Sequence, residues 1–150
     1  MPDERTKTVP ALPPSSPVGS VRCEVRIACP AAAAWVRIAD AGTISDWFPG
    51  MSDSWMAGDT WERHIVMGTG VEVVEDVVNV DGVQRRLQYR IRPNFLVHQH
   101  LATVDVLEDG PDACFVVYAT EMTPRPFALA ISGGTYDAIH ELKRQLESDG

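Results

Sequence analysis

The stretch TWERHIVMGTGVEVVEDVVNVDGVQRRLQYRIR, residues 60–92, decides the fold of this chain. Hydrophobic and polar side chains alternate along it, as they do in β-strands with one buried face. The sequences GTG at 68–70 and DG at 81–82 interrupt this alternation with residues that are typical of tight turns. The stretch therefore predicts consecutive strands that pair antiparallel as a meander.

Strand-like segments continue on both sides of this stretch. They are rich in β-branched and aromatic residues and are separated by Gly, Pro, Asn and Asp, which mark turns. Together with residues 60–92 they predict about seven strands. The additional segments are VRCEVRIA at 21–28, SWMA at 54–57, HQHLATVDVLE at 98–108 and ACFVVYATEM at 113–122.

Two short helices are predicted between the first and second strands. Pro30 suits the first turn of a helix, which we expect to continue to Ala39. Thr43 or Ser45 can cap a second helical turn that ends near Phe48, before a Pro-Gly pair.

The last segment predicts a long amphipathic helix that begins between residues 125 and 132. Its apolar side chains recur at helical spacing on one face. The pair Gly133-Gly134 has two interpretations, an irregular helix start or removal of side chains to make room for a ligand. The apolar face is formed by Tyr136, Ile139, Leu142 and Leu146.

Length and composition indicate one folded domain. The chain has 150 residues with 45% hydrophobic content, enough for one core. Residues 1–19 are rich in Pro and Ser and are expected to form a disordered tail. Residues 20–150 are then the domain. Cys23, Cys29 and Cys114 have no metal-binding spacing and fit reduced thiols.

Charge and hydropathy exclude several classes of partner. The formal net charge is -8 and no basic cluster occurs, so we expect no nucleic-acid binding. No apolar run approaches the length of a membrane-spanning helix, and the N-terminal segment lacks the apolar core of a signal peptide. These features predict a cytoplasmic protein without membrane insertion.

Several motifs accompany this order of elements: VRCEVRIACPAAAAWVRIAD, ISDWFPG, GDTWERHI, VEDVVNVD, RRLQYRI and YATEMTP. Together they resemble the START-like (SRPBCC) superfamily, most closely its polyketide cyclase/dehydrase branch, over roughly residues 20–146. The resemblance implies an α+β helix-grip fold, in which a seven-stranded curved antiparallel sheet wraps around the long C-terminal helix, with two short helices after the first strand. It also implies an internal cavity for a hydrophobic or aromatic molecule, polyketide-like or lipid-like.

A polar cluster is predicted inside the cavity. A three-residue loop at 68–70 places Arg63 opposite Glu75. A three-residue loop centred on Gly82 brings Glu75 beside Tyr89, whereas a two-residue turn sets Val74 against Tyr89. We prefer the first, because it keeps the apolar side chains on one face. Arg63, Glu75 and Tyr89 are the candidate catalytic residues; the alternative is an exposed ion pair of little energetic value.

Further candidates for ligand contact come from several elements. Trp47 and Phe48 could gate the cavity mouth, while His140 and Tyr136 could reach a ligand from the last helix. His98 and His100 lack a third ligand at a suitable spacing, so no metal is expected. No cofactor motif occurs, and none is expected to bind. The full set is Trp47, Phe48, Trp61, Tyr89, His98, His100, Tyr118, Tyr136 and His140.

Three functions are compatible with this sequence. The first is non-covalent binding of an apolar or aromatic molecule whose oxygen atoms contact Arg63, Tyr89 or Tyr118. The second is a cyclase, aromatase or dehydratase, in which Glu75 moves a proton and Arg63 polarises a carbonyl. The third is a protein-interaction or stress-response module. A homodimer through a free strand edge is also plausible.

Overall fold

A computed structural model describes residues 17–149 of the chain. The predicted disordered tail, residues 1–19, lies mostly outside the described residues. Its last residue, Gly19, is the first residue of β1. None of the helices in the described range is long and apolar enough to cross a membrane. The elements are β1 (Gly19–Ile27), α1 (Ala31–Ala39), the 3₁₀ helix η1 (Ala41–Asp46), β2 (Met51–Met56), β3 (Glu62–Met67), β4 (Glu72–Asp81), β5 (Arg86–Ile91), β6 (Gln99–Glu108), β7 (Cys114–Thr123) and α2 (Pro126–Ser148).

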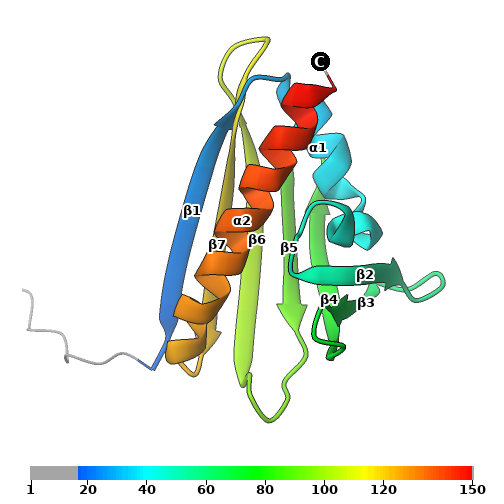
Figure 1. Cartoon of the computed structure of the whole chain (residues 1–150), viewed down its shortest axis with the longest axis vertical. Helices are drawn as coiled ribbons and strands as arrows, with labels where there is room; N and C mark the ends of the chain where they lie inside the picture. Colours follow the sequence, from blue (N-terminus) through cyan, green and yellow to red (C-terminus); the bar gives the residue numbers. More distant parts are fainter. Residues whose placement is uncertain (1–16, 150) are drawn as a thin grey trace, which may run out of the picture.

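The strands form one antiparallel sheet in the order β1-β7-β6-β5-β4-β3-β2. Consecutive strands from β2 to β7 pair as a meander, and β1 closes onto β7. Helix α2 runs diagonally across one face of the curved sheet, while α1 and η1 lie near one end of it (Figure 1). The predicted helix-grip fold is therefore confirmed, including the seven strands and the two short helices after β1.

Small residues let α2 approach the sheet closely. Its buried face contains Ala128, Thr135 and Ala138, followed by Ile139 and Leu142. A Cβ atom on Gly19 of β1 would lie 2.5 Å from the Cβ of Ala128, so only glycine fits there without displacement. This close contact fixes which side of α2 faces the sheet.

The predicted register is confirmed for one hairpin and wrong for the next. Arg63 pairs with Glu75 across β3 and β4, as the GTG loop predicts. Between β4 and β5, however, Glu75 pairs with Ile91, and Tyr89 pairs with Val77. The loop between Asp81 and Arg86 has four residues, and the register shifts between Val77 and Asn79. This bulge keeps Glu75 and Tyr89 on the same face of the sheet.

Candidate functional site

Arg63 and Glu75 form a fully buried ion pair on the concave face. Arg63 is 0% exposed and Glu75 is 3% exposed. Arg63 Nε donates a hydrogen bond to Glu75 Oε2 at 2.7 Å, and Nη2 lies 2.5 Å from the same oxygen. Arg63 Nη1 donates to the carbonyl oxygen of Ala41 at 3.0 Å. The alternative of an exposed surface pair is therefore excluded.

Glu75 has one oxygen with spare hydrogen-bonding capacity. Both close contacts from Arg63 go to Oε2, and within residues 17–149 no donor reaches Oε1. Burial raises the pKa of Glu75, and the charge and hydrogen bond of Arg63 only partly oppose this rise. Glu75 is thus a buried carboxyl group whose affinity for a proton is increased.

Tyr89 and Tyr118 complete the polar cluster from β5 and β7. The guanidinium carbon of Arg63 lies 4.3 Å from the centroid of the Tyr89 ring, a cation–π geometry. The hydroxyl groups of Tyr89 and Tyr118 are hydrogen-bonded to each other. Burial raises the pKa of both phenols, so both keep their protons at neutral pH. The pair can therefore donate a hydrogen bond.

His100 lies beside this cluster on β6. Its ring centroid is 5.7 Å from that of Tyr89, and its Nδ1 accepts a hydrogen bond from the backbone N–H of Ile91 at 3.1 Å. Burial, with a contribution from the Arg63 charge, lowers the pKa of His100 to about 4. The ring is therefore neutral at pH 7, with its proton on Nε2.

Trp47 and Phe48 are packed in the core, and their role as a gate of the cavity mouth stays a prediction. Trp47 is 1% exposed, its rings lie 6.5 Å from Tyr118, and its Nε1 has no hydrogen-bond partner among the described residues. A Cβ on Gly134 would lie 3.4 Å from Phe48. A side chain at position 134 would thus contact Phe48, whereas a Cβ on Gly133 would meet nothing within 4 Å.

Three other candidates lie outside the interior. Trp61 is 66% exposed, because it precedes β3 in the β2–β3 turn, beyond the last paired residues of the hairpin. Tyr136 is 53% exposed, because the small residues Thr135 and Ala138 occupy the helix face that packs on the sheet. His140 stacks on Tyr136 at 4.0 Å and shares its outward position. The prediction that Trp61 lies on the interior face of the sheet is wrong, whereas ligand contact by Tyr136 and His140 stays a prediction.

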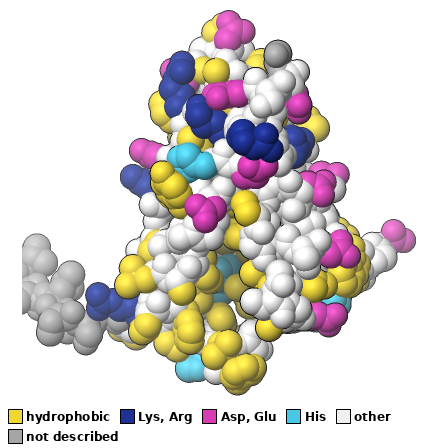
Figure 2. All heavy atoms as spheres, viewed as in Figure 1, with side chains coloured by type: hydrophobic (Ala, Val, Ile, Leu, Met, Phe, Trp, Pro, Cys, Tyr) yellow, Lys and Arg dark blue, Asp and Glu magenta, His cyan; other side chains and the backbone are white. Residues whose placement is uncertain are grey.

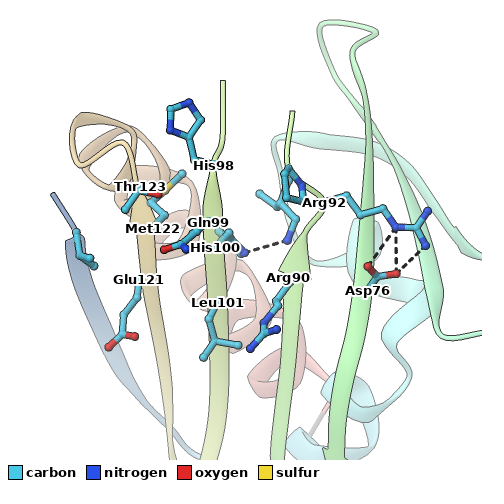
Figure 3. A pocket seen from close by; sticks show the side chains of 13 residues that line it. Asp76, Arg90, Arg92, His98, Gln99, His100, Leu101, Glu121, Met122 and Thr123 are labelled. Carbon is cyan, nitrogen blue, oxygen red and sulfur yellow. Dashed lines mark hydrogen bonds and ion pairs between the residues drawn. The ribbon is translucent and has the colours of Figure 1, made fainter. Parts of the chain in front are cut away.

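A cavity of about 590 Å³ lies where the ends of β5 and β6 separate (Figure 3). His98 is exposed and lines it, whereas His100 lines it from the buried side. Arg90, Leu101 and Glu121 also line this cavity and were missed by sequence reasoning. Pro93, which has no N–H for pairing, is the signal that could have indicated where β5 and β6 separate.

The opposite side of the molecule is hollowed as well. Figure 2 shows a recess between the first half of α2 and β2, with histidine atoms at its floor.

Among residues 17–149 no group of three or more His, Cys, Asp or Glu side chains could hold a metal ion. The three cysteines are free. The site is therefore a polar cluster of side chains beneath α2, with His100 beside it at the edge of the cavity.

Comparison with solved structures places this architecture among known folds. Norcoclaurine synthase from Thalictrum flavum, in complex with dopamine and hydroxybenzaldehyde, is 18% identical with a TM-score of 0.71; the match covers 89% of this chain and 88% of that one. A START superfamily protein from Mycobacterium smegmatis is 14% identical with a TM-score of 0.72, covering 87% and 99%. A protein from Thermobifida fusca is 27% identical with a TM-score of 0.72, covering 85% and 92%.

Sequence comparison gives the family. None of the curated proteins compared with the chain matches it. The family model described as polyketide cyclase / dehydrase and lipid transport, in contrast, matches residues 19–147, from the first residue of β1 almost to the end of α2. With its helix-grip fold, the chain therefore belongs to the polyketide cyclase / dehydrase and lipid transport family.

Proposed function

We propose that this protein binds an apolar, aromatic small molecule, polyketide-like or lipid-like, between the sheet and α2. One observation carries the proposal. The Tyr89–Tyr118 pair has two hydroxyl protons, and the hydrogen bond between them uses one. Within residues 17–149 no oxygen accepts the second proton, and the indole N–H of Trp47 also lacks an acceptor. Buried donors without acceptors are unfavourable, so a ligand oxygen would stabilise them.

Arg63 has a positioning role in this proposal. Its Nε donates a hydrogen bond to Glu75 and its Nη1 to the carbonyl oxygen of Ala41. Its guanidinium carbon lies over the Tyr89 ring and so orients the tyrosine pair. Its Nη2 lies beside Glu75 Oε2 but forms no hydrogen bond among the described residues, so it is a further donor for a ligand oxygen.

Apolar side chains around the cluster favour the hydrocarbon part of such a ligand. Burial of apolar surface contributes about 25 cal/mol per Å², which makes it the main source of affinity. Norcoclaurine synthase, which shares the fold, is in complex with two aromatic molecules that carry oxygen atoms. The buried apolar residues near the cluster include Val77, Leu87, Ala102, Ile139 and Leu142.

The test is a fluorescence titration with prodan, a naphthalene that carries a propionyl ketone and a dimethylamino group. Replacing both Tyr89 and Tyr118 by Phe is expected to weaken prodan binding about fivefold, the effect of losing one hydrogen bond to the ligand. The matched control ligand is dimethylaminonaphthalene, which lacks the ketone and should bind both proteins equally. Trp61→Phe, an exposed aromatic position, is the control variant. Failure of prodan to bind the unaltered protein would refute the proposed function.

A second candidate function, proton transfer of the cyclase, aromatase or dehydratase kind, is favoured by the state of Glu75. Its Oε1 is unbound and its pKa is raised by burial, which suits an acid–base group. A ligand carbonyl held by Tyr89–Tyr118 would place its α-carbon near this cluster. Glu75 would remove a proton from that carbon, and the tyrosine pair would stabilise the enolate oxygen.

Deuterium exchange tests this second function separately. In D₂O the protein should accelerate exchange at the propionyl methylene of prodan, measured by mass spectrometry. Glu75→Gln should reduce that acceleration at least about a hundredfold, the usual contribution of a general base. Prodan affinity should change little in the same variant. Equal exchange rates in the variant and the unaltered protein would remove Glu75 from the proposed chemistry.

A further inference from the structure

The cavity at the ends of β5 and β6 is lined by both faces of the sheet. Adjacent residues of a strand point to opposite faces. His100 and Met122 are paired and buried on the concave side, whereas Leu101 and Glu121, the next pair, point to the convex side. All four line the same cavity. The cavity therefore reaches both faces of the sheet at this point.

Incomplete pairing explains why the sheet is open here. The β5–β6 ladder stops at Tyr89 and Ala102, although β5 continues to Ile91 and β6 begins at Gln99. The backbone N–H of Ile91 donates to the imidazole of His100 in place of a backbone carbonyl of β6. Figure 3 shows this bond between the separated strands, viewed with α2 behind the sheet. The His100 side chain thus occupies the position of the missing backbone pairing.

This opening leads toward the polar cluster. His100 lines the cavity from its buried side, and its ring lies 5.7 Å from that of Tyr89. Tyr89 itself is not among the residues that line the cavity. The imidazole of His100 therefore lies between the cavity and the polar cluster.

We propose that the gap between β5 and β6 is a mouth through which the ligand reaches the polar cluster, and that His100 is its gate. The inference rests on the proposed function and adds a route for the ligand through the sheet. Opening requires rotation of the imidazole and the loss of one hydrogen bond, from Ile91 N–H. The strands themselves need not separate, because no backbone ladder joins them beyond Tyr89.

The lining of the mouth indicates which molecules pass. Ile91, Leu101 and Met122 give it apolar walls. Charged residues of both signs also line it, so neither anions nor cations are selected by net charge. The mouth therefore suits neutral, flat aromatic molecules such as prodan. The charged residues are Asp76, Arg90, Arg92 and Glu121.

Obstruction of the mouth tests the proposal. Leu101→Cys is labelled with benzylmaleimide in a Cys23→Ala background, because Cys29 and Cys114 are buried. The matched control is Leu107→Cys, on the same strand and the same face but outside the cavity. Prodan association and dissociation are then followed by stopped-flow fluorescence. If Leu101→Cys does not fold, Arg90→Cys at the exposed rim of the same mouth replaces it.

Blocking the mouth slows both the association and the dissociation of prodan and leaves its dissociation constant unchanged. We expect labelled Leu101→Cys to show about fivefold slower association and dissociation than labelled Leu107→Cys. Equal rates in the two labelled proteins would overturn the inference but not the proposed function. Weaker affinity with unchanged association would also overturn it, since the gap would then be part of the binding surface. Absence of prodan binding to the unlabelled proteins would overturn both proposals.

Discussion

The two sides of strand β6 differ sharply in how completely they pair. Toward β7, all ten residues of β6 are paired, from Gln99 with Thr123 to Glu108 with Cys114. Toward β5, only four pairs form, from Asp105 with Arg86 to Ala102 with Tyr89. We refer to β7, β1 and the α2 surface packed on them as the β7 side, and to β2–β5 as the β5 side.

The interiors of the two sides differ in the same way. On the β7 side the concave face of β1 and of the start of β7, as far as Val116, is apolar, and Tyr118 of β7 is the one contribution of this side to the polar cluster described above. On the β5 side the interior contains the buried Arg63–Glu75 pair and Tyr89, next to a cavity. Buried charges and unpaired backbone both cost stability. The comparison teaches that continuous strand pairing on the β7 side stabilises the fold while the β5 side has incomplete pairing and a polar interior.

The largest expected effect comes from breaking the ion pair of the β5 side. Arg63→Met leaves Glu75 buried without its partner, and we expect a loss of about 3–5 kcal/mol in unfolding free energy. Urea denaturation at pH 7 measures it. The double variant Arg63→Met/Glu75→Gln should recover part of the loss, because it no longer buries a charge.

A matched control uses an ion pair at the surface of the same side. Arg86 Nε and Nη2 donate hydrogen bonds to the two carboxylate oxygens of Asp105, at 2.7 and 2.9 Å, but the Arg86 side chain is partly exposed. Arg86→Met should therefore cost less than about 1 kcal/mol. If Arg63→Met and Arg86→Met lower the unfolding free energy equally, the buried ion pair of the β5 side contributes no more to stability than an ion pair at the surface.

The next effect is the pH dependence that His100 gives to the junction of the two sides. Its pKa is lowered to about 4 by burial and by Arg63, against about 6.5 in an unfolded chain. Protonation therefore favours unfolding: the stabilisation is complete above pH 6.5 and is lost as the pH falls toward 4. The loss over this window is about 3 kcal/mol. Denaturation at several pH values, compared with His100→Gln, isolates this contribution from the carboxyl groups.

His100→Gln should show a flatter curve over that window than the unaltered protein. The two curves should diverge between pH 6.5 and 4 and run parallel outside it. Parallel curves throughout would mean that His100 is solvated in the folded state, and that the gap between β5 and β6 stands open.

The sequence predicted the fold well because the relevant signals are local. Alternating side chains identify each strand, and the GTG loop fixes Arg63 opposite Glu75. The β4–β5 register was not predictable in this way. It depends on a four-residue loop, with Arg85 at a positive φ of 53°, and on a shift between Val77 and Asn79. Neither feature has a local sequence signal.

The site was predicted less completely, because burial depends on packing between distant elements. Tyr118 and His100 follow the alternation of their strands and are buried as expected. Tyr136 belongs to an apolar helical stripe, yet the smaller Thr135 takes the contact with Cys23 of β1. The ends of β5 and β6 separate because their backbone pairing ends at Tyr89 and Ala102. The alternation of side chains along a strand does not show where pairing with a neighbour ends.

A smaller effect is expected from the close contact that holds the β7 side. In Gly19→Ala the added methyl group would lie 2.5 Å from the Cβ of Ala128 and 2.7 Å from the carbonyl oxygen of Arg125. Backbone must shift, and we expect a loss of about 1–3 kcal/mol in unfolding free energy. Ser20→Ala, at the exposed neighbouring position, is the control and should be nearly neutral. A neutral Gly19→Ala would show that the β7 side yields as easily as the β5 side.

The smallest effect separates two adjacent glycines of α2. A Cβ on Gly133 meets nothing within 4 Å, so Gly133→Ala should add about 0.5–1 kcal/mol through helix propensity alone. A Cβ on Gly134 lies 3.4 Å from Phe48, which precedes β2 and packs beneath α2 from the β5 side. Gly134→Ala should therefore gain less in the same urea titration. Equal gains would mean that Phe48 moves freely under α2, and that the interior of the β5 side is looser than that of the β7 side.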